Sequence, residues 1–251
     1  MKILILIKAR GGGHERVMNS IKPLLEQKGH QVEIISREDD LNCFSTKQAF
    51  FKLRKEIKKR DYDILYTQDW SCALPFLFKK NHFCCHHGLT PSKIGRFLQK
   101  IVGKLMKEKT ISVGPKVKEM FPKSTLIYNG VDLNKFYNME NERKYFGWIK
   151  RDYEEKDEKE INDIARSYGL ELSIADKIPP EKMNKWYNSL KVFASYPRKF
   201  AGFNMCWIEA KASGVPEILG NENGIGIKNV KEKFNEFTWE NNVNKFLEVI
   251  K

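Results

Sequence analysis

The chain has 251 residues, of which 41% are hydrophobic and 31% are charged, and its formal net charge is +13. This balance is typical of a globular protein and excludes a disordered or fibrous chain. The apolar runs are too short to span a bilayer, and no signal-peptide pattern opens the chain. The excess positive charge predicts an anionic partner such as a nucleotide diphosphate, an anionic lipid headgroup or a nucleic acid.

Short apolar runs alternate with helical patterns over the first half of the chain. Residues 2–7 are typical of a buried parallel strand; the glycines at 11–13 then open a helix that ends at Gly29, and residues 32–36 form the next strand. Such a unit carries its ligand at the carboxyl ends of the strands. The alternation continues with helices at 48–59 and 94–107 and strands at 63–66, 83–85 and 110–113.

A second series of the same kind begins near residue 144. Its predicted strands cover residues 144–149, 171–175, 192–195 and 217–219, and its helices cover 154–168, 180–188 and 204–213. We therefore expect an α/β protein with two Rossmann-like lobes that face each other across a cleft. The expected domains are residues 1–138 and 139–238, with a helix over 239–251 that returns to the N-terminal lobe.

Four segments occur in an order that resembles the family-four glycosyltransferases of the GT-B fold, of which this chain would be a short member. They are residues 11–17 with 28–32, residues 87–88, residues 127–132 with Phe136, and residues 201–210 with 213–216. The resemblance implies a retaining hexosyltransferase that uses a UDP- or GDP-sugar and a lipid or glycan acceptor. It also implies that neither a cofactor nor a metal is needed, because the nucleotide-sugar is the substrate.

The resemblance implies roles for residues on both lobes. His87 would position the donor sugar, and Lys150 or Arg151, with Lys156, would offset the charge left on the β-phosphate. A charged, solvated helix start is the alternative for these cations. Glu209 would accept hydrogen bonds from the ribose. The other expected donor-binding residues are Gly12, Gly13, Asn129, Arg198, Gly202, Phe203 and Asn204.

Two departures from the family pattern concern the chemistry. Ala201 stands where the family has a glutamate that contacts the donor sugar, and the loop after Pro216 is shortened. A catalytically weak or inactive nucleotide- or glycan-binding relative is therefore one alternative. A transferase that acts on nucleic acid is another, which only the net charge supports, so nucleic acid is not an expected partner.

The glycine loop and the cysteines allow other interpretations. Glu38 and Asp39 follow the second strand as a ribose-binding acid of a dinucleotide site would, but the third glycine of that fingerprint is missing. Neighbouring cysteines and histidines at 82–87 point to opposite faces of a strand, so a metal site is not expected. The five cysteines show no CxxC spacing, which favours reduced thiols and a cytoplasmic protein.

Two basic amphipathic segments predict peripheral contact with an anionic membrane surface. Their cations are Lys47, Lys52, Arg54, Lys55, Lys58, Lys59 and Arg60 in the first and Lys93, Arg96, Lys100, Lys104, Lys107 and Lys109 in the second. For either helix alone, ordinary packing of its apolar side on the sheet is the alternative.

Overall fold

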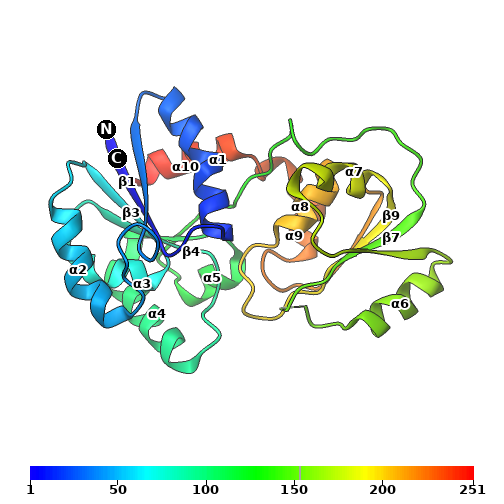
Figure 1. Ribbon diagram of the computed structural model, residues 1–251, viewed down its shortest axis with the longest axis horizontal. Helices are drawn as coiled ribbons and strands as arrows, with labels where there is room; N and C mark the ends of the chain where they lie inside the picture. The colour runs from blue at the N-terminus through cyan, green and yellow to red at the C-terminus, as the bar shows by residue number, and fades with distance from the viewer. Residues whose placement is uncertain (153) are drawn as a thin grey trace. The chain divides into compact units, whose positions relative to one another are not determined.

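The computed structural model describes residues 1–152 and 154–251, which form two compact units, each built on a parallel β-sheet (Figure 1). The first unit comprises Met1–Asn129 and Trp239–Lys251, and the second comprises Gly130–Thr238. The division after residue 129 differs from the predicted one after 138, because backbone amides of this segment bond to the second unit. Val131 donates to the carbonyl of Phe237 (3.0 Å), and Tyr137 donates to Asn184 Oδ1 (3.2 Å).

The first unit contains a six-stranded parallel sheet in the order β2-β1-β3-β4-β5-β6. Its strands are β1 (Lys2–Ile7), β2 (Gln31–Ser36), β3 (Ile64–Gln68), β4 (His82–His86), β5 (Thr110–Ser112) and β6 (Thr125–Leu126). Its helices are α1 (Gly13–Gln27), α2 (Thr46–Lys58), α3 (Trp70–Ala73), α4 (Lys93–Met106), α5 (Pro115–Met120) and α10 (Trp239–Val249), with the 3-10 turns η1 (Leu74–Phe76) and η2 (Lys107–Lys109).

The pleat of these strands sorts the helices onto two faces of the sheet. Leu4 and Leu65, which are register partners, pack in one cluster with Leu53 of α2. Tyr66, the residue after Leu65 in β3, points to the other face, where its ring centroid lies 4.4 Å from that of Phe246 in α10. Helix α10 thus packs on the face opposite α2, and it also packs against α1.

The second unit contains a four-stranded parallel sheet in the order β10-β9-β7-β8. Its strands are β7 (Tyr145–Ile149), β8 (Glu171–Ala175), β9 (Leu190–Ala194) and β10 (Glu217–Leu219). Its helices are α6 (Glu158–Ser167), α7 (Met183–Asn188), α8 (Met205–Ala212) and α9 (Ile227–Glu232), with the 3-10 turns η3 (Pro180–Lys182) and η4 (Phe234–Glu236). Among the described residues, no helix combines the length and the apolar character needed to cross a bilayer.

Candidate functional site

The glycine loop connects the carboxyl end of β1 to the start of α1. Gly11 has φ +71°, a left-handed conformation that favours glycine, whereas Gly12 is extended with φ −102°. A Cβ atom built on Gly11, Gly12 or Gly13 would meet no atom within 4 Å. The protein's own packing therefore requires no glycine at positions 12 and 13, and there is open space beside these residues at the start of α1, where amide N–H groups have no acceptor within the helix.

A network of acids holds this loop in place. The Arg10 guanidinium binds Glu15 (3.0 Å) and Asp40 (2.7 Å), and the Arg10 amide donates to Asp39 Oδ2 (2.7 Å). Asp39 Oδ2 also accepts from the Ser36 hydroxyl (2.6 Å), and these two bonds lower the pKa of Asp39. Glu38 accepts from Arg37 (2.8 Å). Because protein groups already bind both acids, the dinucleotide interpretation gains no support.

His87 follows β4 and lies beside the glycine loop. Its ring centroid is 4.6 Å from that of His14 in the first turn of α1, and its Nε2 is 2.7 Å from Gln68 Oε1 at the end of β3. Burial, together with the nearby His14 and His86, holds the pKa of His87 well below its usual value. The neutral ring therefore donates Nε2–H to Gln68 and leaves Nδ1 free to accept a hydrogen bond from a hydroxyl group.

Replacing Gln68 with glutamate tests this protonation state. A carboxylate at 2.7 Å from the imidazole should raise the pKa of His87, because a nearby negative charge favours the protonated ring. Because His87 of the wild type stays neutral, its turnover should show no titration of His87 between pH 6 and 8. In Gln68→Glu, protonation of His87 should make turnover fall as the pH is lowered. NMR titration of the His87 ring checks the assignment directly, and an unshifted pKa in Gln68→Glu would contradict it.

Asn129 lies at the end of the first unit, after β6. It is 3% exposed, and within the described part of the chain its Oδ1 atom has no hydrogen-bond partner. The amide nitrogen of Gln68 is likewise buried without a partner among those residues. Unpaired buried polar atoms carry a free-energy cost of about 1–3 kcal/mol each, so they are suited to bind a water molecule or a ligand.

Glu209 lies in α8 of the second unit and is 2% exposed. Its Oε2 accepts a hydrogen bond from the Tyr187 hydroxyl at 3.1 Å. Burial, followed by the charge of Glu209, raises the pKa of Tyr187 well above its usual value, and the charge of Arg151 acts in the opposite direction. Burial likewise raises the pKa of Cys206, the second residue of α8, and the charge of Arg151 again opposes the rise. Of the three cations predicted from the sequence, Arg151 is therefore the one whose charge affects the pKa of side chains in both α7 and α8.

The other predicted cations are placed differently. Lys150 binds Glu158 (2.9 Å), and both side chains are more than half exposed. Lys156 binds Glu160 (3.2 Å) and lies over the ring of Tyr196 at 5.2 Å. Exposed ion pairs of this kind contribute little to stability, so both amines can leave their partners easily. Arg198 is exposed and donates from Nε to the carbonyl of Glu154 at 3.3 Å.

A buried polar network, which sequence reasoning missed, holds the start of α8. Ser195 donates to Glu154 Oε1 (2.7 Å), and Asn204 Nδ2 donates to the Ser195 hydroxyl (3.1 Å). Burial raises the pKa of Glu154, which is 5% exposed. In the sequence, the one indication of this network is the polar Ser195 directly after the apolar strand β9. Phe203 lies next to Asn204, and its ring is 5.7 Å from that of Phe237.

The loop after β10 packs over the loop that carries Ala201 and Gly202. Gly224 has φ +65°, and a Cβ there would lie 2.8 Å from the carbonyl oxygen of Gly202. Asn221 and Asn223 both donate to the carbonyl of Pro197, at 3.0 and 2.8 Å. The loop that begins α8 is therefore held from both sides.

The histidine and cysteine side chains around β4 have partners within the protein. His82 lies 2.9 Å from both Thr67 Oγ1 and the Phe76 carbonyl, and His86 stacks on Phe121 at 4.7 Å. No group of three or more metal-ligating side chains suited to a metal ion occurs among the described residues. The five cysteines are free and buried, and burial raises the pKa of Cys72, Cys85 and Cys206 to about 12.

Comparisons with known proteins decide the fold. No protein-family model and no curated protein sequence matches the chain. Sucrose-phosphate synthase from Thermosynechococcus elongatus superposes with a TM-score of 0.63 at 13% identity, over 100% of this chain and 94% of that one. Anabaena HepE in complex with UDP gives 0.61 at 14% identity, over 100% and 96%. The lipopolysaccharide outer core galactosyltransferase WaaB gives 0.61 at 13% identity, over 100% and 90%.

The chain has the GT-B glycosyltransferase fold. In open α/β sheets of this type, ligands bind at the carboxyl ends of the strands. In the first unit of this GT-B chain, that edge carries Gly11–Gly13, Gln68 and His87, and in the second it carries Arg151 and the start of α8.

Proposed function

We propose that the chain is a glycosyltransferase that moves a hexose from a UDP- or GDP-sugar to a lipid or glycan acceptor, with retention and without a metal ion. The observation that carries the proposal is the likeness, over the full length, to HepE, whose structures hold UDP or UDP-glucose. The open glycine loop and the polar side chains at the same edges of the two sheets support it.

Each site residue would have a distinct part in this reaction. Main-chain N–H groups at the starts of α1 and α8 would bind phosphate oxygens, since helix N-termini attract anions. Glu209 would accept hydrogen bonds from the ribose, and the neutral His87 would accept one from a sugar hydroxyl through Nδ1. Arg151, with Lys156 as a second cation, would stabilise the negative charge that develops on the leaving nucleotide.

A catalytically weak or inactive nucleotide- or glycan-binding relative is the second candidate, and Ala201 favours it. The Ala201 amide donates to the carbonyl of Arg198 (2.9 Å), so the backbone forms the turn, but the methyl group supplies no carboxylate for a donor sugar. Binding of a nucleotide-sugar without hydrolysis or transfer would support this candidate over the transferase.

Calorimetry with UDP and GDP, followed by hydrolysis and transfer assays with a panel of nucleotide-sugars, tests both candidates. We expect micromolar binding of one nucleotide and slow hydrolysis of its sugar without an acceptor. Absence of binding to either nucleotide would overturn both candidates.

Glycine-to-alanine substitutions in the loop separate ligand binding from folding. Gly13→Ala should fold normally because its Cβ meets open space, and it should weaken nucleotide binding about tenfold or more by blocking the approach of a phosphate. Gly11→Ala should instead lower stability by about 1–2 kcal/mol, because φ +71° is strained for alanine. Thermal melts and calorimetry on both variants check this, and equal binding by Gly13→Ala and wild type would contradict it.

The acceptor is proposed to be presented at an anionic membrane surface, since the net charge of +13 attracts anionic lipid.

A further inference from the structure

Helices α2, α3 and α4 and the turn η1 form one layer on the first sheet. Leu53 of α2 packs in the cluster of Leu65, and Val102 of α4 packs in the cluster of Cys84. The register pairs Thr67 with Cys84, so Leu65 and Cys84 point to the same face of the sheet. Helix α3 contacts both α2 and α4 (Figure 1). We call these elements, with residues 44–45 and 77–80, the outer helical layer.

Exposed apolar side chains gather on the outer helical layer. Apart from Met1, the large apolar side chains that the structure shows exposed in the first unit all belong to it: Phe44, Phe51, Phe78, Ile94, Phe97 and Leu105. Phe78 is 89% exposed and Ile94 is 77% exposed. Gathered apolar exposure on a soluble surface marks an interaction site, whereas scattered single residues do not.

The same layer is strongly cationic. Between Asp69 and Glu108 the sequence contains no acid, but it contains Lys79, Lys80, Lys93, Arg96, Lys100, Lys104 and Lys107. In α2 the only acid is Glu56, which is bound to Lys59 at 2.9 Å. The cations therefore have few acids beside them and leave a positive surface around the apolar side chains.

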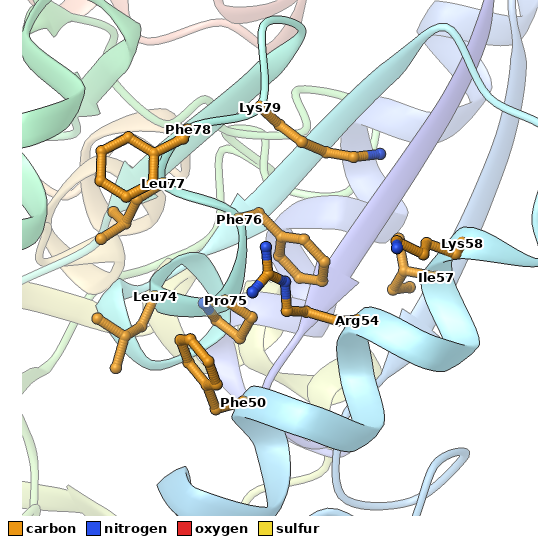
Figure 2. A pocket seen from close by; sticks show the side chains of 10 residues that line it. All are labelled: Phe50, Arg54, Ile57, Lys58, Leu74, Pro75, Phe76, Leu77, Phe78 and Lys79. Atoms are coloured by element: carbon orange, nitrogen blue, oxygen red, sulfur yellow. The ribbon is translucent and has the colours of Figure 1, made fainter.

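A groove between α2 and η1 combines both features (Figure 2). Its volume is about 270 Å³, and Phe50, Ile57, Leu74, Pro75, Phe76 and Leu77 supply most of its apolar lining. Arg54, Lys58 and Lys79 also line the groove, and the Arg54 guanidinium lies 5.5 Å from the Phe50 ring centroid. This volume is slightly below that of usual small-molecule sites, about 300–1,000 Å³, so the groove suits a short stretch of acyl chain.

We propose that the outer helical layer docks on an anionic lipid bilayer, with the α2–η1 groove receiving an acyl segment and the surrounding cations meeting the headgroups. A surface that combines phenylalanine and leucine with lysine and arginine is typical of protein segments that lie at a membrane interface. Protein–protein interfaces are depleted of lysine, and nucleic-acid phosphates would not bind Ile94 or Leu105. This inference rests on the proposed function and names the surface of the chain that would contact the membrane. Docking requires no nucleotide-sugar, so it can be measured without one.

Co-sedimentation of the full chain with vesicles tests the proposal. We expect binding to vesicles of equimolar phosphatidylcholine and phosphatidylglycerol, much weaker binding to pure phosphatidylcholine, and a loss in high salt. Lys100→Gln/Lys104→Gln should weaken partitioning about thirtyfold, at about 1 kcal/mol for each lysine. Phe51→Ser/Phe78→Ser should weaken it at least about tenfold, because burying one such side chain is worth roughly 1.5–3 kcal/mol.

Matched variants in the second unit serve as controls. Lys231→Gln/Lys233→Gln removes two exposed lysines, and Leu133→Ser removes an exposed apolar side chain, so both should partition as the wild type does. Equal loss in the control variants, or no binding to anionic vesicles, would overturn the proposal. Binding to duplex DNA that Lys100→Gln/Lys104→Gln weakens and Phe51→Ser/Phe78→Ser leaves intact would overturn it in favour of nucleic acid. Failure of nucleotide binding would leave these results unaffected.

Discussion

Replacing Glu209 with alanine is expected to weaken the binding of UDP or GDP by on the order of 10²-fold. The carboxylate would accept hydrogen bonds from two ribose hydroxyls, and bonds to a charged group are worth at least about 1.5 kcal/mol each. The loss should appear in calorimetry as a higher Kd. Because Glu209 is 2% exposed, Glu209→Gln is the companion variant, since it keeps the shape of the buried side chain while removing its charge.

Tyr187→Phe is the control for the Glu209 prediction. It removes the hydroxyl that donates to Glu209 at 3.1 Å but leaves the carboxylate in place. Nucleotide affinity should change by less than about threefold, while the melting temperature falls because a buried hydrogen bond of about 1 kcal/mol is lost. Wild-type affinity in both Glu209 variants, with the fold retained by circular dichroism, would show that Glu209 does not bind the ribose.

Local patterns carry most of the information that places the strands and the long helices. The run of apolar residues in β1 predicts a strand buried on both faces, and in the structure every residue of β1 after Lys2 is buried, with β2 and β3 paired to its two edges. Helix starts were less accurate: α6 begins at Glu158 and not at 154, because Asp157 and Glu160 form a capping box. Helix α3 has four residues, which is too short for helical periodicity to reveal.

The boundary between the units could not be read from local sequence. Residues 130–138 belong to the second unit through bonds such as that from the Tyr137 amide to Asn184 Oδ1. Those partners lie far along the chain, and only the folded structure brings them together. Local composition places a polar linker in this region but does not indicate which sheet holds it.

The same distinction applies to the candidate site. A glycine loop after a strand is a local signal that the sequence shows, whereas only the resemblance to a family singles out His87. The hydrogen bond between Gln68 and His87 and the buried contacts of Glu154 connect different strands, so no local pattern reveals them. Likewise, the sequence alone does not distinguish the three cations Lys150, Arg151 and Lys156. The fold shows that the charge of Arg151 affects the pKa of Tyr187 in α7, whereas the two lysines form ion pairs with acids of α6.

Lowering the pH from 7 to 5 is expected to reduce the free energy of unfolding by about 2 kcal/mol through His82 alone. Burial lowers the pKa of His82 to about 3, whereas an unfolded histidine has a pKa of about 6.5. Below pH 6.5 the unfolded chain therefore binds a proton that the folded chain does not. The stabilisation is complete above pH 6.5 and is lost as the pH falls towards 3, at about 1.4 kcal/mol per unit.

Urea unfolding at pH 7 and pH 5, followed by circular dichroism, measures this loss. His82→Gln should be less stable at pH 7, because the bonds to Thr67 and to the Phe76 carbonyl are disturbed, but it should lose about 2 kcal/mol less than wild type on acidification. His30→Gln, at a partly exposed histidine, should keep most of the wild-type acid sensitivity. An equal fall in stability for His82→Gln and wild type would mean that His82 is protonated in the folded protein, which its buried position between Thr67 and Phe76 opposes.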